Sequence, residues 1–379
     1  MIVRDEAARL PRALSSVRAV ADEIVVADTG SKDGTPDLAR QAGARVIEFP
    51  WCDDFAAAIN HVVAHARGEW VLRLDADEEL MPDCHDALQA CLHREDAFAY
   101  LLLRRDLSDA DVPERFSEMW VDRLHRNRPG VQYVGRCHAH PTRTWEALAA
   151  DEGRQVCKSD VRLTHTGYIE SLRGDKLRRA ARLLELELLE RPGQFYYQVE
   201  LANTLLLLGE ARGYDVLRDA LRKLVEHAND ALPPSPMAIL ALDCLLVPDS
   251  KRPSMPLTQA QGLALARRWF PDSVQLLWRA AQSAFGIGDF AVAAAALERL
   301  LSLGESGTYD RSVSFDPRIC GDDARLNLGV CLVRLFRLSE AETCFESLLE
   351  STTAGDQALQ NLNAVKTLKG QQNRDSMNR

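Results

Sequence analysis

Short apolar runs alternate with amphipathic stretches through the first hundred residues, and this alternation restricts the possible folds more than any other feature. Runs typical of strands cover residues 23–27, 45–49, 69–74 and 97–103. Between them, Leu10, Leu14 and Val17 share one helical face. Asp53 or Asp54 can cap a further helix. Strands that alternate with helices predict βαβ units around a largely parallel sheet, and therefore an α/β domain.

Three acidic residues, Asp28, Asp75 and Asp77, directly follow the apolar part of a predicted strand. Ligands of such sheets bind at the carboxyl ends of the strands. Two carboxylates at positions i and i+2 repel each other unless a cation lies between them, and Mg²⁺ or Mn²⁺ prefers oxygen ligands. Such an ion can hold a nucleoside diphosphate and neutralise the charge that forms as it leaves. A bare Asp-x-Asp also occurs in solvated loops, so an incidental role stays open.

The segment that follows Asp28 consists of a short polar loop and a helix start at Thr35-Pro36. An aspartate at the end of a strand can accept hydrogen bonds from a nucleobase imide, and a buried polar pairing of this kind discriminates strongly between ligands. Ser31 and Asp33 are better explained by hydrogen bonds within the turn and the helix cap. Of these three residues, we therefore predict a ligand contact only for Asp28.

From about residue 176, helical patterning dominates the chain. Three segments resemble each other and resemble the second helix of a tetratricopeptide repeat, at residues 214–225, 290–301 and 338–349. The last two are 48 residues apart, whereas the repeat period is about 34 residues, so we expect an insertion over residues 304–323. A generic helical bundle is the alternative. The predicted domains are residues 1–175, an α/β domain, and residues 176–379, an all-α helical-repeat domain.

Composition excludes several classes of function. The net charge of −10 offers no large basic face for a nucleic acid. The nine cysteines include no Cys-x-x-Cys pair, so free thiols in a reducing compartment are expected. No apolar run approaches the roughly 20 residues that span a bilayer, and the first residues contain no apolar signal segment. We predict a cytoplasmic protein without a membrane span or a nucleic-acid partner.

Several ordered motifs together resemble the family 2 glycosyltransferases of the GT-A fold, which are Rossmann-like. The motifs lie at residues 1–6, 28–35, 51–55 and 74–78, and more loosely at 123–127, 134–138 and 165–168. The resemblance, from the first of these motifs to the last, covers nearly half the chain. A branch of this family carries tetratricopeptide-like repeats behind the catalytic domain and includes the glycocin S-glycosyltransferases, which modify peptides. The resemblance implies a hexosyltransferase with a nucleotide-sugar donor, expected to be a UDP-sugar, and Mn²⁺ or Mg²⁺ as cofactor.

The resemblance also implies roles for individual residues. Asp77 would be the metal ligand, and His165 would approach the metal or the diphosphate, although a structural histidine is an equal alternative. Asp28 would contact the nucleobase, Glu6 would shape the nucleotide pocket and Asp75 would lie near the ribose. The full nucleotide-binding set implied is Val3, Glu6, Asp28, Asn60 and Asp75.

The chain departs from the family pattern at three places. Ile59 stands where the family usually has arginine, which removes a cation near the diphosphate. Ala139 stands where a glutamate usually follows, so the general base is absent from that position and His138, His140 or Glu118 are its candidate replacements. The first strand retains only Ile2-Val3, which we attribute either to a start codon further upstream or to a fold that accepts a short strand.

The leading hypothesis is a metal-dependent, inverting transfer of a sugar from a nucleoside diphosphate to a peptide, protein or glycan acceptor that the repeats recruit. A homodimer is a further possibility. The alternative is a non-catalytic scaffold of the tetratricopeptide type with a degenerate glycosyltransferase domain. A nucleotidyltransferase would use the same metal chemistry, but the chain has no glycine-rich phosphate loop.

Overall fold

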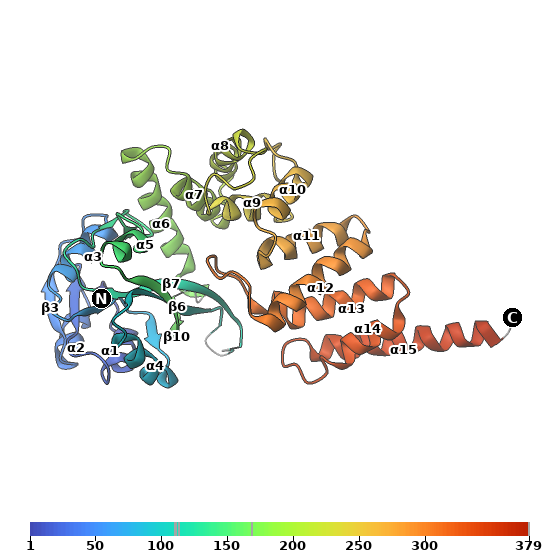
Figure 1. Ribbon diagram of the computed structural model, residues 1–379, viewed down its shortest axis with the longest axis horizontal. Helices are drawn as coiled ribbons and strands as arrows, with labels where there is room; N and C mark the ends of the chain where they lie inside the picture. Colours follow the sequence, from blue (N-terminus) through green and yellow to red (C-terminus); the bar gives the residue numbers. More distant parts are fainter. Residues whose placement is uncertain (110–111, 113, 168–169, 378–379) are drawn as a thin grey trace. The chain divides into compact units, whose positions relative to one another are not determined.

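The computed structural model describes residues 1–109, 112, 114–167 and 170–377 (Figure 1). The chain divides into two compact units, Met1–Glu210 and Ala211–Arg379. The first unit contains every described strand, and the second is helical. The predictions of an α/β domain and of a helical region behind it are confirmed.

Two sheets and a short ribbon form the framework of the first unit. The first sheet is parallel, in the order β1 (Ile2–Val3), β2 (Val25–Asp28) and β3 (Arg45–Glu48). The second has the order β4 (Trp70–Leu72), β7 (Phe116–Arg126), β6 (Ala97–Leu107), β10 (Gln155–His165) and β5 (Glu78–Leu80). Within it, β6 and β10 are parallel and the other neighbours are antiparallel. The ribbon pairs β8 (Tyr133–Val134) with β9 (His140–Pro141). All four strands expected from the sequence form.

Seven described helices belong to the first unit, and in four of them, α1, α2, α3 and α5, a proline or a short polar cap stands at the start. They are α1 (Leu10–Val17), α2 (Thr35–Gln41), α3 (Phe55–Ala64), α4 (His85–Leu92), α5 (Trp145–Asp151), α6 (Glu170–Glu190) and α7 (Phe195–Leu207), with a 3₁₀ turn η1 (Pro82–Cys84). Asp54 caps α3 by accepting a hydrogen bond from the Ala57 amide at 2.9 Å, which confirms one of the two expected caps. The helix start expected at Thr35-Pro36 is that of α2, with Gly34 at the N-cap position, and the Thr35 hydroxyl accepts from the Glu6 amide at 2.8 Å.

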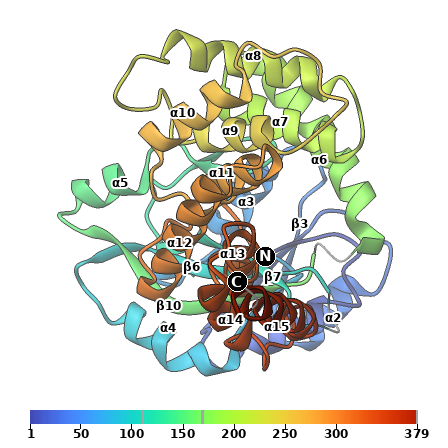
Figure 2. The same cartoon turned by 90° about the vertical axis from the view of Figure 1, so that its right-hand side faces the viewer.

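Helices cover both faces of the five-stranded sheet, which explains its long apolar runs. Figures 1 and 2 show α4 on one face and α5 on the other. One core lies beneath α4 and contains Tyr100 and Leu102. The other lies beneath α5 and contains Phe98 and Trp145. Each large apolar side chain buried here contributes about 1.5–3 kcal/mol, so the sheet is a rigid base for its strand ends.

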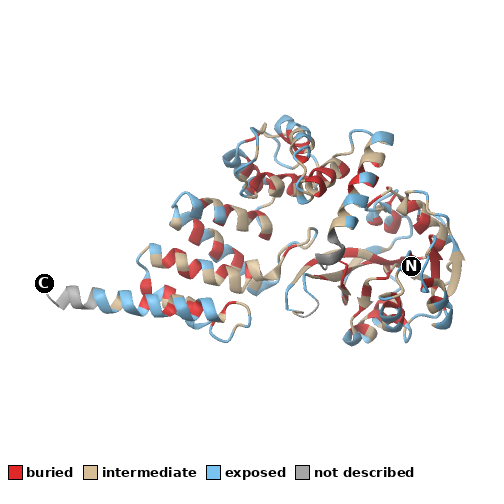
Figure 3. Cartoon of the chain, turned by 180° about the vertical axis from the view of Figure 1, so that it is seen from behind, coloured by how far each residue is buried: buried red, intermediate tan, exposed pale blue. Residues whose placement is uncertain are grey.

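The second unit contains only helices among its described residues. They are α8 (Gly213–Glu226), α9 (Ala238–Leu246), α10 (Gln259–Trp269), α11 (Val274–Gly286), α12 (Phe290–Ser306), α13 (Asp322–Arg334), α14 (Leu338–Glu346) and α15 (Gly355–Met377), with a 3₁₀ turn η2 (Pro317–Cys320). The three similar segments fall in α8, α12 and α14, as expected. Figure 3 shows buried residues along one side of these helices.

Small residues allow neighbouring helices of the second unit to approach closely, as in tetratricopeptide repeats. Helix α12 packs on α11 and α13, and α14 packs on α13 and α15. A Cβ atom at Gly329 of α13 would lie 2.5 Å from a ring carbon of Phe345 in α14. Residues 307–321, between α12 and α13, contain a loop and η2, where the insertion is expected.

The boundary between the compact units lies at residue 210, so α6 and α7 belong with the sheets. The predicted functional division at residue 175 stays a prediction, because compactness alone does not define a functional domain. None of the described helices is long and apolar enough to cross a bilayer.

Candidate active site

Asp75 and Asp77 occupy the tight turn that joins β4 to β5. The backbone amide of Asp75 donates to the Glu78 carboxylate at 3.1 Å, and the Glu78 amide donates back to the Asp75 carbonyl at 3.1 Å. The Asp77 carbonyl accepts from the Thr166 amide at 3.0 Å, just beyond β10. These bonds hold the acidic turn against the end of β10.

Asp77 faces His165, the last residue of β10. The His165 Nε2 atom lies 3.5 Å from Asp77 Oδ2, and its Nδ1 atom lies 2.6 Å from Asp106 Oδ1 on β6. All three side chains are at least mostly buried. Burial lowers the pKa of His165, but the carboxylates of Asp106 and Asp77 outweigh it and raise that pKa to about 9.

A lysine from α6 completes the surroundings of Asp77. The Lys176 ammonium lies 2.7 Å from Asp77 Oδ2. Burial opposes ionisation of Asp77, but His165 and Lys176 together hold the pKa of this carboxyl well below its usual range. A Cβ atom at Gly167 would overlap with Asp77 Oδ2 and His165 Nε2 and lie 2.7 Å from Lys176 Nζ. Gly167 therefore keeps open the space where these three groups meet.

Asp75 is held by a different cation, Arg123 of β7. The guanidinium lies 2.6 Å from Asp75 Oδ2 and 2.5 Å from Glu78 Oε1, and Glu78 is fully buried. Tyr100 pairs with Leu124 while Leu101 pairs with Asp122, so Arg123 is the extra residue of a β-bulge. Bulges redirect a side chain next to functional sites. Here the bulge directs Arg123 into the acidic turn.

One face of β6 changes from apolar to charged along the strand. Tyr100 and Leu102 lie in the core beneath α4, and the next residues on that face are Arg104 and Asp106. Arg104 binds Asp106 at 2.8 Å and approaches Glu78 at 3.5 Å. The charged cluster is therefore the polar end of a core face, where the strands leave the hydrophobic interior.

The first parallel sheet brings the other expected nucleotide contacts together. Asp28 is buried at the end of β2, and its carboxylate accepts from the amides of Gly30 and Ser31 at 3.2 Å. The neighbouring Val3 side chain lies in the core, and its carbonyl accepts from the Thr29 amide at 3.0 Å. Asp33 accepts from the Thr35 amide at 2.9 Å, a bond within the turn of the expected kind, whereas the Ser31 hydroxyl accepts from the distant Asp5 amide at 2.9 Å.

Glu6 follows β1 and lies near this group. Its carboxylate binds Arg9 at 2.6 Å. Burial raises the pKa of Glu6, Arg9 lowers it and the Asp77 charge raises it further. The ligand-binding roles of Val3, Glu6, Asp28 and Asp75 stay predictions.

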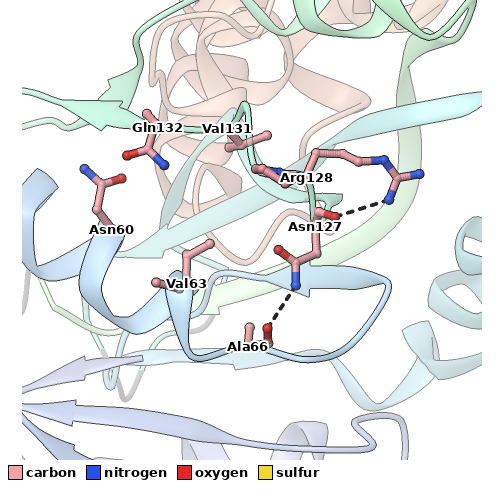
Figure 4. A pocket seen from close by; sticks show the side chains of 9 residues that line it. Asn60, Val63, Ala66, Asn127, Arg128, Val131 and Gln132 are labelled. Carbon is pink, nitrogen blue, oxygen red and sulfur yellow. Dashed lines mark hydrogen bonds between the residues drawn. The ribbon is translucent and has the colours of Figure 1, made fainter.

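Asn60 was expected to contact the nucleotide, and in the structure its side chain binds the backbone of Tyr133. Its side chain donates to the Tyr133 carbonyl at 2.9 Å and accepts from the Tyr133 amide at 2.8 Å. It also borders a pocket of about 470 Å³ between the end of α3 and residues 127–132 (Figure 4). This pocket lies beside the start of β4, where the Asn127 amide binds the Glu69 carbonyl, and so at the opposite end of that strand from the Asp75 turn.

The two candidate bases lie in different surroundings. Glu118 of β7 pairs with Arg105, so strand alternation places it on the face opposite to Asp106. His138 is exposed between β8 and β9, with Nε2 3.8 Å from Glu200 Oε2 of α7. His140 binds the Pro141 carbonyl. Assignment of the general base stays a prediction.

The departures from the family pattern have local explanations. Ile59 lies in the core beneath α5, where an apolar side chain fits and a guanidinium does not. Ala139 packs against the same core. Tyr168, which closes the last motif, lies outside the described residues.

The sequence alone did not identify Asp106, Lys176 or the role of Arg123. Asp106 follows two arginines near the end of a strand whose first seven residues are apolar, and charged residues at the end of such a strand could have indicated a site. Lys176 stands among many helical charges and has no such signal. The role of Arg123 depends on a bulge that only strand pairing defines.

Residues 1–142 match the family model described as glycosyl transferase family 2. They form a family 2 glycosyltransferase domain. The predicted resemblance is therefore confirmed for this part of the chain. Asp75 and Asp77 lie within the matched residues. His165 and Lys176 come after them in the chain.

Two relatives illustrate the extent of the similarity. A TPR repeat-containing protein of Synechococcus elongatus is 45% identical over 138 residues, 36% of this chain and 33% of the relative. The prophage-derived glycosyltransferase SunS of Bacillus subtilis is 33% identical over 85 residues, 20% of this chain and 19% of the relative. The chain spans about a third of the length of the first of these relatives.

Among solved structures, the mannosyltransferase PcManGT from Pyrobaculum calidifontis, in complex with GDP-Man and Mn²⁺, is 18% identical. The match covers 72% of this chain and 86% of that chain with a TM-score of 0.36, which is too low to establish a common fold.

Proposed function

We propose that this protein transfers a sugar from a nucleoside-diphosphate donor to an acceptor, with inversion at the anomeric carbon and with Mn²⁺ or Mg²⁺ as cofactor. The observation that carries the proposal is the grouping of Asp77, Asp106 and His165 at adjacent strand ends; the first two lie within the residues that match the family 2 glycosyltransferase model, and His165 follows them. A UDP-sugar is the proposed donor, and a peptide, protein or glycan is the proposed acceptor.

The residues around Asp77 suit a divalent ion. Asp106 accepts the Nδ1 proton of His165 and Nε2 is directed at Asp77, so Nε2 can act as a ligand when a metal ion displaces its proton. Gly167 contributes no side chain to the space above them. The described residues contain no group of three metal-ligating side chains, so Asp77 and His165 would hold the ion together with donor phosphate oxygens and water. When bound, the ion supplies positive charge for the departing diphosphate.

Other residues would bind and orient the donor. Asp28 is proposed to accept from the nucleobase, since a carboxylate with two oxygens can accept more than the two amides it already binds. Arg123 keeps Asp75 ionised and fixed near the proposed ribose position. His138 is the preferred base, because Glu118 lies on the opposite face of the sheet from Asp106.

Three further elements of the proposal concern the protein's surroundings. The helical unit is proposed to recruit the acceptor, because helical repeats offer extended concave surfaces. A cytoplasmic location and a homodimer are also proposed.

Calorimetric titration of UDP and of GDP, with and without Mn²⁺, tests the proposal directly. We expect metal-dependent binding to the unaltered protein and its loss in Asp77→Ala. Asp86→Ala is the matched control, since Asp86 is an exposed aspartate on α4. Binding of neither nucleotide under any condition would contradict the proposal and favour a scaffold function for the helical unit.

A further inference from the structure

Lys176 occupies a position that conflicts with a metal ion at Asp77. Its ammonium lies 2.7 Å from Asp77 Oδ2, the same oxygen that faces His165 Nε2 at 3.5 Å. A divalent ion bound to that oxygen and to His165 would lie next to the ammonium, and like charges at this separation repel each other strongly in a partly buried site. The lysine and the metal therefore cannot both bind Asp77 as the structure shows it.

The surrounding charges explain why Lys176 binds there. A continuous chain of acidic and basic groups connects the two aspartates of the turn: Asp75, Arg123, Glu78, Arg104, Asp106, His165, Asp77 and Lys176. It contains four carboxylates, two guanidinium groups, the lysine and the histidine. Without the lysine, Asp77 would rely on His165 alone for compensation of its charge.

Lys176 is also able to leave. Its side chain is 29% exposed, whereas that of Asp77 is 11% exposed, so the ammonium reaches the carboxylate from the solvent side. A lysine has a flexible stem and three rotatable donors, and it binds phosphate as a point charge. Arg123 lacks this freedom, because its guanidinium is buried between two carboxylates.

We propose that Lys176 holds the cation position at Asp77 in the free protein, yields it to a divalent ion, and then binds the diphosphate of the donor. This inference rests on the proposed function and adds a donor-binding residue to it. Bound metal and bound lysine are alternatives at one oxygen, so each weakens the other in the absence of donor. Once donor is present, the same lysine assists binding.

The test uses Mn²⁺ alone and then UDP with saturating Mn²⁺, titrated into the full chain and into Lys176→Met. We expect Mn²⁺ to bind Lys176→Met about five- to ten-fold more tightly than the unaltered protein, and UDP to bind it about ten-fold more weakly. Arg178→Met is the matched control, because it removes one positive charge from the same helix at a side chain that is 65% exposed and pairs with Asp175. Far-UV circular dichroism establishes that the variants are folded.

Opposite changes in the two affinities are the result expected, since a purely structural role would not strengthen one and weaken the other. Unchanged or weaker Mn²⁺ binding in Lys176→Met would overturn the inference, while loss of Mn²⁺ binding in Asp77→Ala would still uphold the proposed function. Tighter Mn²⁺ binding with unchanged UDP affinity would overturn the diphosphate role. If no variant binds Mn²⁺, both the exchange and the metal dependence fail.

Discussion

Gly167 is the single residue whose replacement most directly probes the charged cluster. A Cβ atom there would overlap with Asp77 Oδ2 and His165 Nε2, which are ends of side chains and can move apart. We predict that Gly167→Ala keeps the fold but weakens Mn²⁺ binding by about ten-fold or more, because small misplacements of binding groups are costly. Calorimetry measures the affinity. Gly130→Ala is the control, since no atom lies within 4 Å of a Cβ atom there; equal effects of both variants would contradict the prediction.

His125 gives the stability of the first unit a defined pH dependence. The ring is fully buried, stacks on Trp145 at 4.9 Å and leaves Nε2 without a partner in the described structure. Burial lowers its pKa from 6.5 to about 4, so the unfolded state binds more protons between these values. The free energy of unfolding therefore includes a contribution from neutral His125 that is fully present above pH 6.5 and is lost as the pH falls toward 4. At pH 5 the free energy of unfolding is lower by about 2 kcal/mol than above pH 6.5.

Chemical unfolding at pH 7 and pH 5 measures this effect. We expect His125→Phe, which keeps an aromatic ring beside Trp145, to lose less stability between these pH values than the unaltered protein. His93→Phe serves as the control, because His93 is exposed. An identical pH dependence in His125→Phe and the unaltered protein would show that the buried ring does not titrate as described.

At the scale of elements, the contact between α13 and α14 depends on the absence of a side chain. Phe345 is fully buried and its ring covers Gly329, where an added Cβ atom would lie 2.5 Å from the ring. We predict that Gly329→Ala destabilises the second unit by about 1–3 kcal/mol through overpacking. Gly286→Ala in α11 is the control, because a Cβ atom there meets no other atom within 4 Å. We expect this variant to stabilise the second unit by up to about 1 kcal/mol, since alanine favours helix more than glycine does. Thermal unfolding measures the stability of the two variants. Stabilisation by both substitutions would contradict the close contact between α13 and α14.

At the scale of the whole molecule, α6 and α7 connect the folding of the first unit to its site. Glu187 of α6 is fully buried and accepts from the Arg136 amide at 2.8 Å, and Arg182 pairs with Asp53. Tyr197 of α7 is buried against Gly135, where φ is +108° and a Cβ atom would overlap with the tyrosine oxygen. Through these contacts the two helices support the loop between β8 and β9, which carries the candidate base His138.

We therefore predict that residues 1–210, expressed alone, fold and bind Mn²⁺ and UDP with the affinity of the full chain. Residues 1–175 lack most of α6 and all of α7, and we expect them to be unfolded or to bind at least about ten-fold more weakly. Circular dichroism and calorimetry compare the two fragments. Equal behaviour of both would place the functional boundary at residue 175, as the sequence predicts.

The sequence by itself determined the features that depend on local patterns. The alternation of apolar runs predicted the four strands, Asp54 capped its helix as expected, and the Asp-x-Asp turn followed a strand. These follow from hydrophobic period, cap chemistry and motif spacing, which involve residues close together in the chain. Glu187 and Gly329 carry no such local signal.

Only the tertiary structure decided which distant residues meet at Asp77. His165 is 88 residues from it and Lys176 is 99, and Asp106 joins them because β6 and β10 pair in parallel. The orientation of Arg123 depends on a bulge between β6 and β7. Strand order, register and helix docking arise from burial and charge compensation across the whole first unit, and no local pattern encodes them.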